Sequence, residues 1–182
     1  MMINSKVEVK PALSEIEEFE IDDVGMLEAF NTDGLRSLLT TMSHIPNMKE
    51  KTLRYPGHAS LMQSMIDRNF FDKNNFDLTV KKLFTEWKLE NYEPEFTVLD
   101  INIYGDEQNI HYHLYDEMDM LSKSSSMART TGYTATATVN MLLNNLWSKK
   151  GVSPPEVVGT NECCINFLLD YLSSRNVKIS QI

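Results

Sequence analysis

Two alternating segments joined by a short turn constrain the fold of this chain more than any other feature. In Glu95–Tyr104 and Asn109–Tyr115, apolar and polar residues alternate, so apolar side chains collect on one face of each segment. The apolar positions are Leu99, Ile101 and Ile103, then Ile110, Tyr112 and Leu114. Residues 105–108 between the segments contain turn-forming residues. The pattern predicts a β-hairpin with one apolar face.

Further strands and helices are expected on both sides of this hairpin. Periodicity and turn signals predict strands over 14–22, 48–55 and 177–179, and helices over 35–42, 61–66, 77–87, 127–147 and 163–173. This order favours an α+β fold with a mixed, largely antiparallel sheet covered by helices. The length of 182 residues suits one domain. We expect that domain over residues 13–182, after a frayed N-terminal segment over residues 1–12.

The charge of the chain disfavours two classes of partner. Seventeen Lys and Arg against 26 Asp and Glu give a formal net charge of −9, which repels nucleic acid and anionic lipid. No apolar run is long enough for a membrane helix, and the N-terminus lacks the pattern of a signal peptide. We therefore expect a cytoplasmic protein that binds neither nucleic acid nor membrane. The two cysteines are adjacent and badly placed for an unstrained disulfide.

Glycine-rich phosphate loops are absent from the sequence, which contains only seven glycines. One candidate anion site remains, where Leu53-Arg54-Tyr55-Pro56-Gly57-His58 predicts a strand, a tight turn and a helix N-terminus. Arg54 can hold a substrate carboxylate through its guanidinium, although a surface ion pair is the more frequent role of such an arginine. His58 is a candidate general base, or simply a residue of the first helical turn.

Small and hydroxyl residues crowd the start of the helix expected over 127–147. Ser126 to Thr138 includes Arg129, Thr130 and Gly132, and glycine and threonine lower helix propensity. Close packing of the helix against a neighbour explains such residues more often. Alternatively, hydroxyls and first-turn amides bind a carboxylate or phosphate beside Arg129.

Two histidines of the predicted hairpin point the same way. His111 and His113 are two residues apart on a strand, as two ligands of a zinc site can be. A third ligand cannot be identified from spacing, and a polar face of the hairpin explains the pair more simply. We therefore assign no metal site from the sequence.

Four separated blocks together resemble the saccharopine dehydrogenase and lysine 6-dehydrogenase-like family, in order and approximate spacing. They are Leu27-Glu28-Ala29-Phe30-Asn31-Thr32-Asp33-Gly34-Leu35-Arg36, Met48-Lys49-Glu50-Lys51-Thr52-Leu53-Arg54-Tyr55-Pro56-Gly57-His58, Met127-Ala128-Arg129-Thr130-Thr131-Gly132-Tyr133 and Lys150-Gly151-Val152-Ser153-Pro154-Pro155-Glu156. The similarity runs from about Pro11 to the end of the chain. It identifies the chain with the C-terminal substrate-binding and dimerisation domain of that family, without the family's N-terminal Rossmann domain.

The resemblance implies an oxidoreductase that uses NAD or NADP at a C–N bond of an amino acid of the lysine or saccharopine class. It places seven residues in blocks that face the substrate: Asn31, Thr32, Asp33, Arg54, Tyr55, Arg129 and Thr130. Arginine and threonine would hold carboxylates, and Asp33 would bind an amino group or cap its helix. The resemblance also implies a homodimer. It identifies no catalytic acid or base in these residues.

Three hypotheses follow. The first is an engineered or truncated part of such an enzyme, folded but unable to transfer hydride alone, with any NAD or NADP bound outside this chain. The second is a complete, non-catalytic module that self-associates or binds an amino acid. The third, a metal-dependent enzyme, rests on His111 and His113 alone.

Overall fold

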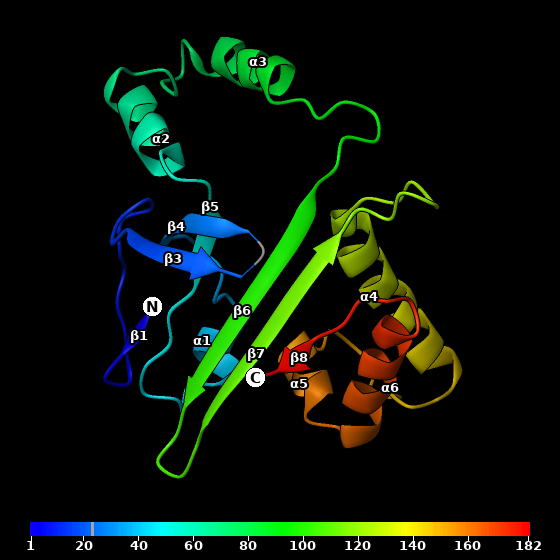
Figure 1. Ribbon diagram of the computed structural model, residues 1–182. Helices are drawn as coiled ribbons and strands as arrows, with labels where there is room; N and C mark the ends of the chain where they lie inside the picture. Colours follow the sequence, from blue (N-terminus) through cyan, green and yellow to red (C-terminus); the bar gives the residue numbers. More distant parts are fainter. Residues whose placement is uncertain (23) are drawn as a thin grey trace. The chain divides into compact units, whose positions relative to one another are not determined.

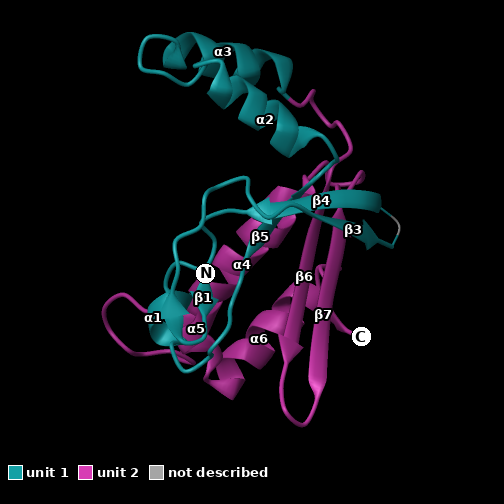
Figure 2. Cartoon of the chain, turned by 90° about the vertical axis from the view of Figure 1, so that its left-hand side faces the viewer, with its two compact units in different colours: residues 1–88 teal, residues 89–182 magenta. Residues whose placement is uncertain are grey.

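The chain forms two compact units in the computed structural model, which describes residues 1–22 and 24–182 (Figures 1 and 2). Unit 1 is Met1–Lys88 and unit 2 is Leu89–Ile182. Each unit combines antiparallel strands with helices, which confirms the predicted α+β class. Within the described residues, however, the strands form three separate sheets in place of one mixed sheet.

Unit 1 contains a β-hairpin, a three-stranded antiparallel sheet and several helices. Its elements are β1 (Met2–Ile3), β2 (Lys6–Val7), β3 (Glu17–Ile21), β4 (Gly25–Asn31), α1 (Leu38–Thr41), β5 (Lys51–Arg54), α2 (His58–Asp67) and α3 (Phe76–Glu86). The larger sheet has the order β3-β4-β5. Its central strand β4 is buried from Leu27 to its last residue. The sequence did not predict β4, because its buried positions include Glu28 and so do not alternate.

The predicted succession of strand, tight turn and helix is confirmed where β5 meets α2. Gly57 is the N-cap of α2 and has φ of +99°, a conformation that favours glycine. The next helix, α3, has Asn75 as its N-cap, two residues before the expected Asp77. Asp77 lies in the first turn instead, where the positive end of the helix dipole stabilises its carboxylate.

Unit 2 is built on the predicted hairpin. Its elements are β6 (Phe96–Tyr104), β7 (Asn109–Glu117), α4 (Ser126–Leu143), α5 (Pro155–Gly159), α6 (Glu162–Ser173) and β8 (Ser180–Gln181). The sheet order is β6-β7-β8, and Tyr104 pairs with Asn109 at the hairpin turn. Helices α4 and α6 lie on one face of the hairpin (Figures 1 and 2). Leu114 of β7, Leu172 of α6 and Val177 form the buried cluster between the hairpin and the helices.

Two predicted elements of unit 2 differ from the structure. The last strand is Ser180–Gln181 and not residues 177–179, because Val177 is buried in the core and its amide bonds to Leu172. Pro154 and Pro155 were expected only to end a helix. They also begin α5, because proline is compatible with the first turn of a helix.

The proposed boundary between residues 1–12 and 13–182 stays a prediction. In the first segment β1 pairs with β2, and Met2 is buried and bridges to Met48. Among the described residues, no helix combines the length and the apolar character that crossing a membrane requires.

Candidate functional site

The turn after β4 holds three of the predicted substrate contacts. Glu50 occupies this turn, because its carboxylate accepts hydrogen bonds from the Thr32 hydroxyl at 2.8 Å and from the Gly34 amide at 2.9 Å. Asp33 is exposed and does not cap a helix, since Ser37 is the N-cap of α1. The Thr32 hydroxyl is therefore already bound by a carboxylate of the chain.

Asn31, at the end of β4, has an incomplete set of hydrogen bonds. Its side-chain amide donates to the Ser14 hydroxyl at 3.0 Å and to the Glu15 carboxylate at 3.2 Å. Its side-chain oxygen is buried and has no partner among the described residues. Buried polar atoms are normally hydrogen-bonded, so this oxygen has an unused capacity to accept a hydrogen bond.

Arg54 lies at the opposite end of β5 from this turn. Asn31 pairs with Lys51 and Glu28 pairs with Arg54, so three residues, or roughly 10 Å of strand, separate the two ends. The Arg54 side chain is exposed and donates to the Leu53 carbonyl at 2.7 Å. No carboxylate of the described residues forms an ion pair with it. Tyr55 follows it and is 60% exposed.

The N-terminus of α2, which the sequence offered as an anion site, already binds a carboxylate. Glu28 extends from β4 and accepts from the amides of Gly57 at 3.0 Å and Ala59 at 2.5 Å. Burial alone would raise the pKa of Glu28, but these amide donors outweigh it and hold the pKa below its ordinary value. The helix dipole thus stabilises a carboxylate of the chain itself.

His58, the first residue of α2, packs between aromatic rings. Its ring is 6.0 Å from that of Phe30, nearly parallel, and 5.7 Å from that of Trp87. Burial, together with the charge of Arg54, lowers the pKa of His58, against an opposing effect of Glu28. The sequence left open whether His58 is a base or a helix residue, and its ring contacts are those of a packed helix residue.

Arg129 is buried in unit 2 and paired with an aspartate. Its Nε and Nη2 donate to the Asp116 carboxylate at 3.0 to 3.3 Å in a bidentate arrangement, and Nη2 also donates to the Arg175 carbonyl at 3.2 Å. Arg129 and Asp116 are only 7% and 4% exposed. The hydrogen bonds that Arg129 donates to the Asp116 carboxylate raise the pKa of Arg129, against an opposing effect of burial. Its guanidinium therefore joins α4 to β7.

The start of α4 resembles that of α2 in its capping. Glu95, just before β6, accepts from the amides of Ser126 and, at 3.4 Å, Met127, while the Ser125 hydroxyl accepts from Ala128. The Thr130 hydroxyl donates to the Ser126 carbonyl of its own helix at 2.9 Å. The predicted contacts thus lie in three places, namely the turn after β4, the end of β5 and the start of α4.

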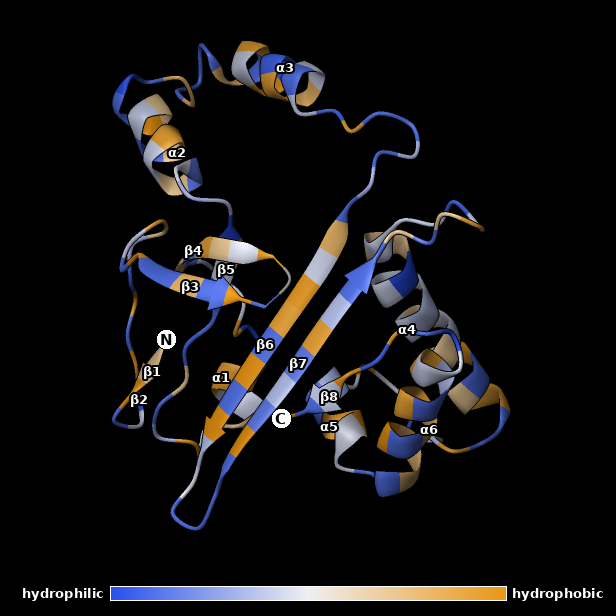
Figure 3. Cartoon of the chain, viewed as in Figure 1, coloured by the Kyte–Doolittle hydropathy of each residue, from blue (hydrophilic) through white to orange (hydrophobic). Residues whose placement is uncertain are grey.

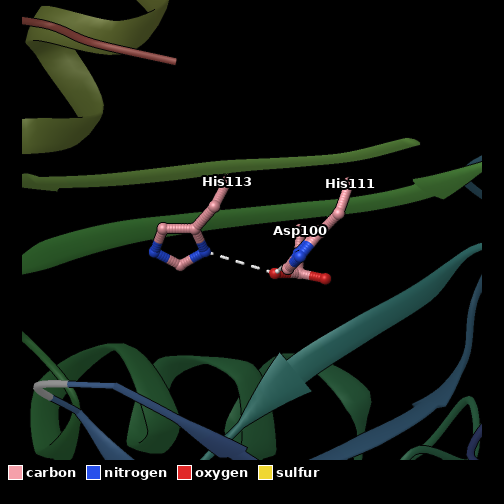
Figure 4. Close-up of side chains that lie close together, drawn as sticks. All are labelled: Asp100, His111 and His113. Atoms are coloured by element: carbon pink, nitrogen blue, oxygen red, sulfur yellow. Dashed lines mark hydrogen bonds and ion pairs between the residues drawn. The ribbon is translucent and has the colours of Figure 1, made fainter. Parts of the chain in front are cut away.

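A cluster that the sequence only half identified lies on the β6–β7 hairpin (Figure 4). Asp100 pairs directly with His113, and its Oδ2 is 2.8 Å from His111 Nε2 and 3.2 Å from His113 Nδ1. The three side chains can offer ligand atoms that all lie within 4.8 Å of one another. Burial alone would raise the pKa of Asp100, but hydrogen bonds to both histidines hold it below its ordinary value. The hairpin register was the signal that could have identified Asp100.

Strand β6 also carries exposed apolar side chains. Leu99, Ile101 and Ile103 are each between 39% and 48% exposed and lie on the same face of the hairpin as Leu114 of β7. Figure 3 shows hydrophobic, orange positions along β6. In the sheet order, β6 pairs with β7 alone among the described strands. Its other edge therefore has backbone groups available for another strand.

The comparison with protein families gives a match along almost the whole chain. The model described as the saccharopine dehydrogenase C-terminal domain matches residues 1–177. This match includes all seven predicted substrate contacts, the whole of unit 1, and unit 2 as far as residue 177.

Proposed function

The chain belongs to the saccharopine dehydrogenase C-terminal domain family, and from this premise we propose that it is the substrate-binding and dimerisation part of an oxidoreductase. Its proposed substrate is an amino acid of the lysine or saccharopine class, oxidised at a C–N bond. The observation that carries this proposal is the family match over residues 1–177. The family uses NAD or NADP as the hydride carrier.

Arg54 is the strongest candidate for the residue that holds the substrate carboxylate. It is exposed, it ends a strand beside a tight turn, and no carboxylate of the described residues pairs with it. A guanidinium that is not already paired with a carboxylate can bind one through two parallel hydrogen bonds. Tyr55 and Asp33, both exposed, are proposed as further contacts. Thr32 and Asn31 remain proposed only if substrate displaces Glu50 from the Thr32 hydroxyl and reaches the buried Asn31 oxygen.

Arg129 and Thr130 are proposed to have structural roles within unit 2. Their polar groups are occupied by Asp116 and by the backbone of α4, so a substrate carboxylate would have to displace a buried ion pair. Such a pair is costly to break. We therefore assign them to positioning α4 and not to direct contact.

The N-termini of α2 and α4 do not fit the pyrophosphate of a dinucleotide. Pyrophosphate commonly binds at a helix N-terminus, but Glu28 fills that position at α2 and Glu95 fills it at α4. A second negative group at either place would be repelled. We therefore propose that NAD or NADP binds outside this chain, and we derive no hydride-transfer step from these residues.

Calorimetric titration with lysine and with saccharopine tests the carboxylate assignment. We expect Arg54→Ala to weaken binding at least tenfold, or about 1.4 kcal/mol, because a charge-assisted bidentate contact is lost. Arg68→Ala is the control, since Arg68 is an exposed arginine at the end of α2. Equal weakening by both substitutions, or none by Arg54→Ala, would remove Arg54 from the proposed site.

We further propose that the dimer forms between two copies through β6. One edge of β6 pairs with no other described strand, and it can form backbone hydrogen bonds. The exposed side chains of Leu99, Ile101 and Ile103 add apolar area. The family is implicated in dimerisation. A second copy of the chain presents the same edge, so the contact can be symmetric.

Sedimentation velocity at several concentrations measures this association. We expect Ile101→Lys to shift the protein toward monomer, because dimerisation would then bury the lysine ammonium without a partner, which costs free energy. Leu121→Lys is the control, because Leu121 is 97% exposed and lies outside β6. A dimer that survives Ile101→Lys unchanged would exclude β6 as the interface.

A further inference from the structure

We propose that Asp100, His111 and His113 form a binding site for one divalent transition-metal ion, with zinc as the best-fitting ion. The site lies on the β6–β7 hairpin (Figure 4). Its residues are on the face opposite Leu114, which packs against helix α6 of the same unit. Nothing in the proposed amino-acid oxidation uses these residues. The inference is therefore independent of the proposed function.

The spacing of the ligand atoms matches a coordination sphere. Zinc binds imidazole nitrogen and carboxylate oxygen at roughly 2.0 to 2.2 Å, so two ligand atoms of a tetrahedron lie about 3.3 Å apart. Asp100 Oδ2 lies 2.8 Å from His111 Nε2 and 3.2 Å from His113 Nδ1. All three ligand atoms lie within 4.8 Å of one another. A modest opening of the cluster would place an ion at its centre.

The hairpin fixes the three side chains on one scaffold. His113 is directly opposite Asp100, while His111 is opposite Asn102, so all four residues share one face of the two strands. Asn102 donates to Asp100 Oδ1 at 2.8 Å. This hydrogen bond holds one carboxylate oxygen and leaves Oδ2 facing the histidines. Metal ligands commonly have such an orienting partner.

The donor set selects the class of ion. Two imidazoles and one carboxylate suit zinc and its first-row neighbours, whereas Mg²⁺ and Ca²⁺ prefer oxygen ligands throughout. The side chains of His111, His113 and Asp100 are 35%, 21% and 21% exposed, so the site opens to one side. Three protein ligands leave at least one position for water or another small ligand.

Titration of the metal-free chain with Co²⁺ and with ZnCl₂ tests the proposal. We expect one ion per chain, visible absorption bands of protein-bound Co²⁺ that zinc displaces, and no displacement by excess Mg²⁺. His111→Ala, His113→Ala and Asp100→Asn should each weaken the affinity at least tenfold. Asn102→Ala, which removes an orienting hydrogen bond, should weaken it about tenfold, in the range for such partners.

Two controls separate site binding from other effects. His44→Ala removes an exposed histidine of unit 1 and should leave the affinity and the cobalt spectrum unchanged. Asp100→Asn keeps the shape of the side chain, and circular dichroism of every variant reports whether the hairpin is folded. The proposal is overturned if no saturable binding occurs, or if folded His111, His113 and Asp100 variants bind as the wild type does.

Discussion

Arg54 in unit 1 and Arg129 in unit 2 are the same residue type, and both lie in blocks that identify the family. Arg54 is exposed and has no carboxylate partner among the described residues, whereas Arg129 is buried and bidentate to Asp116. The sequence offered both as ligands of a substrate carboxylate. Their burial and pairing indicate different roles, because moving Arg129 to a substrate carboxylate would break its buried ion pair with Asp116, which costs free energy.

The two helix starts extend this comparison. Glu28 caps α2 and Glu95 caps α4, in each case from a position in or just before a strand. The dipole of a helix N-terminus stabilises any anion that binds there. A carboxylate of the same chain is held next to the helix by the fold, so it occupies this position before a ligand can. A helix start next to an arginine therefore predicts an anion but does not say whether the protein supplies it.

The largest expected effect is the loss of the buried ion pair. Arg129→Ala leaves Asp116 buried without its partner, which should lower the free energy of unfolding by about 3–5 kcal/mol. Urea unfolding followed by circular dichroism measures this value. The double variant with Asp116→Asn should recover part of the loss, and strict additivity of the two single effects would contradict a direct pair.

A smaller loss is expected at the start of α2. Glu28→Gln keeps the size of the side chain but removes the charge that accepts from Gly57 and Ala59, and should cost about 1–3 kcal/mol. Thermal unfolding compares it with Glu18→Gln, whose side chain is exposed on β3. Equal melting temperatures for the two variants would show that the hydrogen bonds of Glu28 to the start of α2 do not contribute to stability.

The pH dependence of unit 1 should reflect His58. Its pKa in the folded protein is below the ordinary value of about 6.5, so the unfolded chain binds the proton more readily. Stability is therefore fully present above pH 6.5 and falls as the pH decreases through this value. His58→Phe preserves a ring against Phe30 and should flatten the profile between pH 7 and pH 5. An unchanged profile would assign the dependence to other groups.

The smallest expected effect sharpens the contrast between the arginines. Arg54→Ala should change the free energy of unfolding by less than about 0.5 kcal/mol, because Arg54 is exposed and has no buried partner among the described residues. The urea unfolding used for Arg129→Ala measures it under identical conditions. A loss comparable to that of Arg129→Ala would show that Arg54 is a structural residue.

Local patterns predicted much of unit 2. The alternation on both sides of residues 105–108 identified the hairpin, and its register follows once Tyr104 is opposite Asn109. That register brings Asp100 opposite His113, although spacing along one strand could identify only the two histidines. The pairing of strands brings together residues such as Asp100 and His113, whose separation in sequence does not indicate that they are neighbours.

The partners of the charged residues were harder to predict. The second strand was expected to end at Tyr115, so Asp116 was left out of the sheet and could not be matched with Arg129. Strand β4 was missed because Glu28 is buried within it. Both failures concern buried charges, whose partners come from distant segments and which break the apolar pattern on which prediction depends.

A thermal shift experiment with saccharopine and lysine tests the central claim, that Arg54 binds substrate while Arg129 supports the fold. The ligand should raise the melting temperature of the wild type, since binding to the folded state alone stabilises it. Arg54→Ala should melt near the wild-type temperature without ligand and show a much smaller rise with it. A full ligand-induced rise in Arg54→Ala would contradict the account.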